Sequence, residues 1–246
     1  MKIFALIFCA LFAFSCAQPE SAETVLEKAI IHAGSENLNA AEVTFIFRKK
    51  EYSFYKNGGQ YRYQSIGTDS SGNKILDILS NQGFKRFIGD SLVELTPEKE
   101  KSYSNSLNSV IYFAFLPLWL KDSAVQKELV GTVTIKDHKY HKLKISFVEE
   151  NGGEDFKDLF YYYFDKKDGS LDYLAYKYET DKGGIRFRVA QNPRVINGVL
   201  IQDYINLKPK DLSSTDFSKI EEHFVNDELT ELSLITLEDV QVRLKP

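Results

Sequence analysis

Residues 141–178 read HKLKISFVEENGGEDFKDLFYYYFDKKDGSLDYLAYKY, and this stretch decides the fold. It contains three runs rich in aromatic and aliphatic residues, separated by Asn151-Gly152-Gly153 and by Lys166-Lys167-Asp168-Gly169. Turn residues between short apolar runs are typical of a β-meander. No segment long enough for a crossover helix separates the runs, so we expect neighbouring strands to pair antiparallel.

The second run differs from the first because it has no polar face. In the first run, Leu143, Ile145 and Phe147 alternate with lysine and serine. Residues 159–164, LFYYYF, are apolar or aromatic at every position. A strand with one wet face alternates, so this pattern indicates a strand covered on both faces, by other elements or by a cavity.

The remainder of the chain consists mostly of short alternating runs joined by turns. Residues 23–34 carry an apolar stripe at helical spacing that ends at Gly34, which predicts an N-terminal helix without a capping box. Asn197-Gly198 predicts a hairpin, Pro193 predicts a bulge before it, and residues 232–244 are predicted to form one last long strand. The predicted fold is mainly β (α+β), with about ten or eleven antiparallel strands in a strongly curved sheet.

A helical insert interrupts the strands between residues 96 and 120. Thr96 and Pro97 form a typical helix start, and the segment becomes strongly apolar towards Trp119, the only tryptophan. Pro117 must end or kink the helix. We expect the insert to cover the sheet, either as a plug that fills the core or as a lid over a cavity.

The N-terminus has the features of a secretory signal followed by a lipidation site. Lys2 precedes an apolar run over residues 3–14, which is shorter than the ~20 residues of a membrane-spanning helix. The small residues Ser15 and Ala17 flank Cys16, as is typical of a signal cleavage site. Cleavage immediately before Cys16 would leave an N-terminal cysteine for lipidation. Ordinary cleavage after Ala17 is the alternative.

Cysteine usage favours lipidation. No cysteine follows Cys16, so its thiol has no disulfide partner in an oxidising compartment. We therefore predict a lipoprotein signal peptide at 1–15, a tether at 16–22 and a single domain at 23–246. The tether lacks a run of acidic residues, which favours a location in the cell envelope, anchored by the lipid to the outer membrane and facing the periplasm.

Composition and motifs argue against nucleic-acid binding and catalysis. The net charge is −4 and no basic cluster occurs, whereas phosphate backbones require a positive surface. The sequence has no serine-hydrolase elbow, zinc-protease motif or dinucleotide-binding motif, and no cysteine after Cys16 for thiol catalysis. The acidic turn from Glu149 to Asp158 leaves a hydrolase as a distant alternative. We expect no enzymatic activity, cofactor or metal ion.

Three segments carry a resemblance to a known family: NSLNSVIYFAFLP at 105–117, DYLAY at 172–176 and GGIRFR at 183–188. Together with the signal and the early helix, they resemble an uncharacterised family of bacterial envelope lipoproteins. The expected architecture is similar to the half-open barrels of LolA-like and LppX-like lipoprotein and lipid carriers. The resemblance implies a half-open barrel that accommodates a ligand.

We predict that the protein binds an apolar or amphiphilic ligand, such as a lipid or an acyl chain, without catalysis. Arg186 and Arg188 share one strand face within an apolar run, so either would contact a head group, or they would pair internally with Asp203. The alternative is an envelope scaffold or partner-binding lipoprotein whose barrel holds no ligand. The candidate ligand-binding residues are Phe45, Phe47, Tyr61, Phe113, Phe115, Trp119, Tyr161, Tyr176, Arg186 and Arg188.

Overall fold

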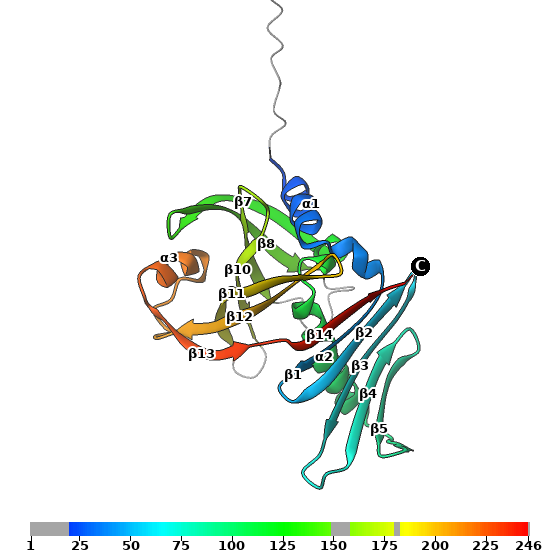
Figure 1. The fold of residues 1–246 in the computed structure, drawn as a ribbon. Coiled ribbons are helices and arrows are strands. Elements are labelled where there is room, and N and C mark those ends of the chain that lie inside the picture. The colour runs from blue at the N-terminus through cyan, green and yellow to red at the C-terminus, as the bar shows by residue number, and fades with distance from the viewer. Residues whose placement is uncertain (1–19, 149–157, 180–182, 246) are drawn as a thin grey trace, which may run out of the picture.

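The computed structural model describes residues 20–148, 158–179 and 183–245. These residues form two seven-stranded antiparallel sheets and three α-helices (Figure 1). The prediction of a mainly β fold is confirmed. The prediction of one strongly curved sheet is wrong, because the strands belong to two separate sheets.

Sheet A has the strand order β14-β1-β2-β3-β4-β5-β6 and sheet B the order β13-β12-β11-β10-β9-β8-β7. The strands of sheet A are β1 (Ala40–Phe47), β2 (Lys50–Asn57), β3 (Gln60–Thr68), β4 (Lys74–Ser80), β5 (Gly83–Ile88), β6 (Ser91–Leu92) and β14 (Glu238–Leu244). Those of sheet B are β7 (Val125–Ile135), β8 (His138–Phe147), β9 (Leu159–Asp165), β10 (Leu171–Tyr178), β11 (Gly184–Ile196), β12 (Val199–Pro209) and β13 (Leu229–Ile235).

The segment 232–244, predicted as one strand, is divided between the sheets. β13 ends at Ile235 in sheet B, and β14 begins at Glu238 in sheet A. Two side chains of sheet B hold the junction at Leu237: Asp203 accepts a hydrogen bond from its N–H (3.0 Å), and Arg194 donates to its carbonyl (2.5 Å). The chain therefore crosses from one sheet to the other at a point fixed by contacts distant in sequence.

The β11–β12 hairpin has the predicted turn and the predicted bulge. The turn is at Asn197-Gly198, and the register shifts between Gln191 and Arg194, on either side of Pro193. Proline has no N–H to donate to the ladder, so a bulge at this position is expected. Both predictions are confirmed.

Helix α1 (Ala22–Ala33) begins with a capping box, so the prediction of a helix without one is wrong. Thr24 N–H donates to the Ser21 hydroxyl, and Ser21 N–H donates to the Thr24 hydroxyl, so threonine takes the place of the usual glutamate. The helix ends at Gly34, which adopts φ 60°. A Cβ atom there would lie 1.9 Å from the Gly198 carbonyl oxygen, so glycine lets the helix end pack against the β11–β12 hairpin.

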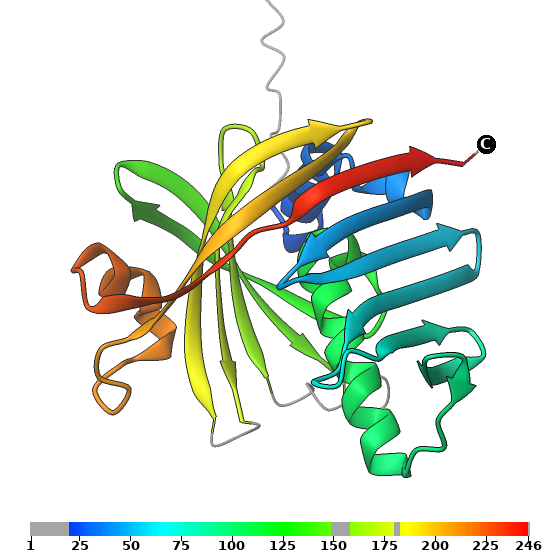
Figure 2. The ribbon, with the colours of Figure 1, turned by 60° about the horizontal axis from the view of Figure 1, so that its bottom comes forward.

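Helix α2 (Pro97–Ala114) lies between the two sheets (Figure 2). Thr96 caps its first turn, accepting from Lys99 N–H, and the helix ends before Pro117, as predicted. Leu107 and Ile111, one turn apart, are buried against sheet A. A short 3₁₀ helix at Leu118–Lys121 then leads into sheet B.

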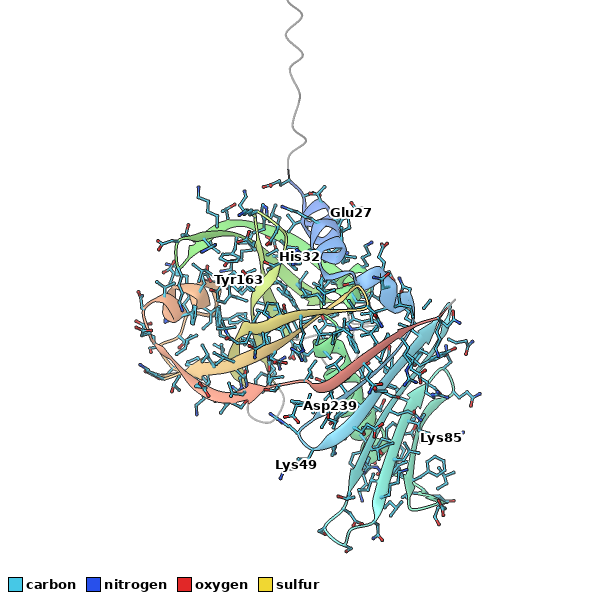
Figure 3. The ribbon with its side chains drawn as sticks, in the orientation of Figure 1. Glu27, His32, Lys49, Lys85, Tyr163 and Asp239 are labelled. Atoms are coloured by element: carbon cyan, nitrogen blue, oxygen red, sulfur yellow. The ribbon has the colours of Figure 1, made fainter. Side chains whose placement is uncertain are left out.

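Three apolar clusters make up the core. The α1 cluster lies between α1 and sheet B, the α2 cluster joins α2 to sheet A, and the α3 cluster lies between the far face of sheet B and α3 (Ile220–Val225). β9 contributes Tyr162 to the first cluster and Tyr163 to the third; Figure 3 shows Tyr163 on the side of α3. The prediction that β9 is covered on both faces is confirmed, and α3 covers the second face.

Candidate ligand-binding cavity

A cavity of about 260 Å³ is lined by α2, by the end of β1 and by residues of β10 to β13. Small-molecule sites span ~300–1,000 Å³, so this volume suits a small ligand. Its apolar lining comes from Phe47, Val110, Phe113, Ala114, Ile235 and Leu237. Its polar lining comes from Arg48, Ser109, Tyr176, Arg188, Gln202, Tyr204 and Asn206.

Strand and helix periodicity explains how these side chains come together. Gln202, Tyr204 and Asn206 occupy every second position of β12, so they share one face of sheet B. On α2, Val110 and Ala114 are one turn apart and line the cavity beside the row that packs on sheet A. The cavity therefore has a mostly polar wall on sheet B and a mostly apolar wall on α2.

Arg188 lies at the centre of the polar wall and is only 8% exposed. Its Nη2 donates to the Tyr176 hydroxyl at 3.1 Å, and its guanidinium carbon lies 4.0 Å from the Phe113 ring centroid. Its Nε is buried without a hydrogen-bond partner, and no carboxylate of the described residues pairs with it. Arginine does not lose its proton in proteins, so this charge stays in the wall.

Asn206 is the cross-strand neighbour of Arg188 and is also incompletely bonded. The two residues face each other in the β11–β12 register. Asn206 Nδ2 donates to the Ser233 hydroxyl at 3.3 Å, which leaves Oδ1 buried without a partner. A buried donor and a buried acceptor without partners therefore occupy adjacent strands at one place in the wall.

Tyr204 and Gln202 complete this wall with hydroxyl and amide groups. Gln202 Nε2 donates to the Tyr204 hydroxyl at 2.7 Å and to the Leu171 carbonyl at 2.9 Å. Burial raises the pKa of Tyr204, so its hydroxyl stays protonated at neutral pH. Because it accepts from Gln202, it keeps its own proton available for a further acceptor.

The rim of the cavity carries a second positive charge. Arg48 is exposed in the two-residue turn between β1 and β2, where Arg48 and Lys49 both adopt positive φ. Its guanidinium lies 5.0 Å from the Phe47 ring centroid. Lys49, next to it, is labelled in Figure 3. Two arginines and no acidic residue are among the described residues that line the cavity.

A larger hollow of about 820 Å³ lies against sheet B beside Tyr161, Ile185 and Phe217. It is more open, and none of its described lining residues keeps a buried polar atom without a partner. Among the described residues, no group of three or more histidine, cysteine, aspartate or glutamate side chains is arranged to hold a metal ion. We therefore assign the candidate site to the smaller cavity.

The family model of DUF6503, a family of unknown function, matches residues 1–239. The chain belongs to DUF6503. The predicted membership of an uncharacterised family is thereby confirmed. No curated protein matches this DUF6503 chain in sequence.

Solved structures place this DUF6503 chain among LolA-like folds. It is similar to a LolA superfamily protein from Nitrosomonas europaea, with 10% identity, a TM-score of 0.50 and coverage of 93% of this chain and 96% of the other. Similarity extends to a DUF1329 family protein from Desulfovibrio piger (8% identity, TM-score 0.44, coverage 91% and 93%) and to the lipoprotein LppX from Mycobacterium tuberculosis (10%, 0.31, 64% and 90%). The first of these three is similar enough to establish the fold, which is LolA-like.

The structure separates the ten predicted ligand-binding residues into three groups. Phe47, Phe113, Tyr176 and Arg188 line the cavity. Phe45, Tyr61, Phe115 and Trp119 belong to the α2 cluster, where they pack against other rings. Tyr161 lies in the α3 cluster on the opposite face of sheet B, and Arg186 donates to the Tyr178 hydroxyl at 2.6 Å outside the cavity lining.

The predicted internal pairing of Arg186 or Arg188 with Asp203 is wrong. Asp203 pairs with Arg194 at 3.1 Å, on the face of β12 opposite to Tyr204. The sequence reasoning also missed Gln202, Tyr204 and Asn206. Their alternation along one strand was the signal that could have identified them, since polar groups at i, i+2 and i+4 share a face.

Several predictions concern residues beyond the described ranges. The signal peptide, Cys16 and most of the tether precede residue 20, and the acidic turn of the hydrolase alternative falls, except for Asp158, within residues 149–157. In the part of the chain that the structure describes, no helix combines the length and apolarity needed to cross a bilayer.

Proposed function

We propose that this DUF6503 protein is a non-catalytic, lipid-anchored envelope protein that binds an anionic amphiphile in the cavity between its sheets. The observation that carries the proposal is Arg188. It is a permanently charged side chain, 8% exposed, with an unpartnered Nε and no carboxylate of the described residues paired with it. A buried charge without a counterion is destabilising, and an anionic ligand would supply the counterion.

The chemistry of the wall favours a carboxylate or phosphate head. Arginine presents several N–H donors in a plane and binds such oxyanions through charge-assisted hydrogen bonds. The Tyr204 hydroxyl supplies a further donor, and no described acidic side chain in the lining would repel the anion. Arg48 adds a positive charge at the rim, where it would favour the approach of an anion.

The opposite wall favours an apolar tail. Val110, Phe113 and Ala114 of α2 face the cavity together with Phe47 and Ile235. Removing apolar surface from water stabilises a complex by ~25 cal/mol per Å². A ligand with one short chain would therefore bury its tail against α2 while its head contacts sheet B.

The envelope location is inferred from the N-terminus and is supported by the fold. The apolar run before Cys16 has the length and flanks of a secretory signal, and a LolA superfamily protein shares the fold. We place the protein at the outer membrane, facing the periplasm and held by a lipid on Cys16. The intact mass of the processed full chain tests this anchor, which Cys16→Ser would remove.

The central experiment is native mass spectrometry, with organic extraction, of residues 17–246 secreted without the anchor. This segment contains every described element of the fold. We expect a co-purifying acidic lipophile at a stoichiometry near one. Arg188→Met should lower its retention roughly tenfold or more, because a hydrogen bond to a charged group is worth ~1.5–3 kcal/mol.

Arg186→Met is the matched control, because Arg186 lies on the same strand two residues away and outside the cavity lining. This variant should retain the lipophile. A bare protein mass that stays unchanged after incubation with envelope lipids would overturn the proposal. It would favour the alternative, a scaffold or partner-binding lipoprotein.

A further inference from the structure

The chain between the lipidation site and the folded domain is short, and this restricts how the domain sits on a membrane. Three residues separate Cys16 from Glu20, the first residue that the structure describes. Four peptide links span at most ~14 Å when fully extended. We propose that the N-terminal end of α1 and the two turns beside it rest against the head groups of the anchoring membrane, with the cavity rim directed away from that membrane. This inference rests on the lipid anchor of the proposed function.

The domain end of this tether is held in place by the start of α1. Ala22, the first residue of the helix, is 6% exposed, and the capping box at Ser21 closes the first turn. The Glu20 carboxylate lies 3.1 Å from Lys166 Nζ and 3.3 Å from His141 Nε2. Exposed ion pairs contribute little stability, so the buried face of α1 is what fixes the point at which the tether begins.

Two turns of sheet B lie beside the start of α1. The β9–β10 turn is joined to the helix by Lys28, whose Nζ donates to the Lys166 and Lys167 carbonyls at 2.7 and 3.0 Å. The β7–β8 turn lies next to it, because Lys166 N–H donates to the Lys139 carbonyl at 3.0 Å. The N-terminal half of α1, residues 136–139 and residues 166–169 therefore form one surface around the tether, which we call the tether surface.

The chemistry of the tether surface suits contact with head groups without insertion. Among the large apolar side chains that are exposed in the described residues, only Ile31 lies on α1 or on either turn. Attraction to anionic lipids requires a cluster of basic residues without acidic neighbours. The exposed charges here are mixed in sign: Lys28, Lys139, Lys167, Glu23, Glu27 and Asp168. The short tether, and not electrostatic attraction, therefore sets the orientation.

The cavity rim lies on the other side of the domain. Arg48 and Ser109 are the exposed residues of the cavity lining. Figure 3 shows Lys49, which follows Arg48 in the β1–β2 turn, towards the bottom of the molecule, and Glu27 of α1 towards the top. A domain of about 230 residues is roughly 45 Å across, about three times the reach of the tether. The tether allows the domain to tilt but not to turn its rim onto the membrane.

This orientation determines where the ligand comes from. With the rim directed into the periplasm, a lipid of the anchoring membrane cannot enter the cavity directly. The amphiphile must arrive through water, alone or carried by another molecule. Each buried CH₂ group holds a chain in a membrane by ~0.8 kcal/mol, so short chains leave it most easily. The small volume of the cavity, about 260 Å³, is consistent with such a short-chain ligand.

Fluorescence quenching on the lipidated full chain tests the orientation. After cleavage before Cys16, that cysteine carries the lipid and no other follows it, so a thiol-reactive fluorophore labels only an introduced cysteine. The protein is placed in vesicles of phosphatidylethanolamine and phosphatidylglycerol that contain a lipid with a nitroxide quencher on its head group. We expect strong quenching for Lys167→Cys and Lys139→Cys, and several-fold weaker quenching for Lys49→Cys. All three positions are exposed lysines, so Lys49→Cys is the matched control.

A longer tether separates the effect of its length from an attraction of the surface itself. About 60 glycine and serine residues, inserted between Ala17 and Gln18, have a root-mean-square span of roughly 43 Å, which is close to the width of the domain. The difference in quenching between Lys167→Cys and Lys49→Cys should then largely disappear. A difference that persists would overturn the role of the tether, because the surface itself would then be holding the membrane.

The outcomes distinguish this inference from the proposed function. Equal quenching of Lys167→Cys and Lys49→Cys with the native tether, on protein whose intact mass shows a lipid on Cys16, overturns this inference alone. An intact mass without that lipid overturns the anchor of the proposed function and this inference with it. Ligand binding in the cavity is tested separately, by the lipophile that co-purifies with the secreted residues 17–246.

Discussion

Lys142 and Arg188 are buried cations on opposite faces of sheet B, and they differ in what surrounds them. Lys142, 3% exposed on β8, contacts both carboxylate oxygens of Glu221 (2.7 and 2.8 Å) and the Ser218 carbonyl (2.6 Å). The Tyr163 hydroxyl donates to the same carboxylate at 2.9 Å (Figure 3 labels Tyr163). Arg188, 8% exposed on β11, has one hydrogen bond and no described carboxylate partner.

This difference separates a structural charge from one that is available to a ligand. The bonds of Lys142 attach α3 to sheet B, and they satisfy the lysine and the glutamate together. Arg188 is partly stabilised by the rings of Phe113 and Tyr176, since a cation above an aromatic face gains about 0.5–2 kcal/mol. Rings do not replace a counterion, and in the proposed function a bound anion would take that role.

The largest expected effect is on the structural charge. Lys142→Met leaves Glu221 buried and without its counterion, and breaking such a pair costs ~3–5 kcal/mol. We expect the free energy of unfolding, measured by urea denaturation, to fall by about this amount. The double variant Lys142→Met/Glu221→Leu should recover most of the loss, because no charge is then left buried.

Lys144→Met is the matched control for this experiment. Lys144 lies two residues further along β8 and pairs with Glu128 at 3.4 Å, with both side chains at least 40% exposed. Exposed pairs contribute ~0–1 kcal/mol, so this variant should unfold nearly as wild type does. Equal losses for Lys142→Met and Lys144→Met would contradict the role assigned to the buried pair.

The second prediction is an increase in the free energy of unfolding, not a decrease. In ligand-free protein, Arg188→Met removes an uncompensated buried charge and keeps a side chain of comparable length. We expect the free energy of unfolding to rise by about 1–2 kcal/mol. Proteins often keep binding residues at a cost in stability, and replacing such a residue removes that cost. The measurement is urea denaturation of protein extracted free of lipid.

Arg194 provides the comparison within the same strand. It pairs with Asp203 and donates to the Leu237 carbonyl, so Arg194→Met should lower the stability while Arg188→Met raises it. If Arg188→Met destabilised ligand-free protein as much as Arg194→Met does, Arg188 would be a structural residue like Lys142. The distinction between the two sides of sheet B would then be lost.

The sequence predicted much of the local structure because local structure depends on neighbours along the chain. The alternation in β8, the two-faced apolar run of β9 and the bulge at Pro193 are all visible in short windows. The division into two sheets is not, because β13 and β14 diverge at Leu237, which is held by Arg194 and Asp203 from β11 and β12. Residues 232–244 alone contain no signal for that break.

The candidate site was predictable in kind but only partly in detail. Arg186 and Arg188 have the same pattern in the sequence, an arginine between apolar residues on one strand face. Arg188 lies against the ring of Phe113 on α2, whereas Arg186 lies two residues nearer the start of β11 and donates to the Tyr178 hydroxyl. Which arginine lines a cavity depends on the path of a helix more than 70 positions earlier, and short-range patterns contain no information about that path.

The smallest expected effect concerns His141. Like Lys142 it lies near a carboxylate, and like Arg188 it has a buried nitrogen without a partner among the described residues. It is 5% exposed next to Lys142 on β8; its Nε2 lies 3.3 Å from a Glu20 carboxylate oxygen, and its Nδ1 has no partner among the described residues. Burial lowers the pKa of His141, and the nearby Lys166 and Lys28 act in the same direction, while Glu20 opposes them. Unlike arginine, histidine can therefore lose its charge when it is buried.

The sign of the pH dependence follows from this lowered pKa. Below the pKa of ~6.5 of an unfolded histidine, the unfolded chain binds a proton that the folded chain does not yet bind. Stability contributed by His141 is therefore present at pH 7.5 and declines as the pH falls through that value. We expect the free energy of unfolding of wild type to decrease from pH 7.5 to 5.5 more steeply than that of His141→Gln, and Glu20→Gln to make the decrease steeper still. Parallel curves for wild type and His141→Gln would show that burial does not disfavour the charged imidazole. Burial would then also be a weaker reason to expect an anion at Arg188, whose guanidinium has no neutral form.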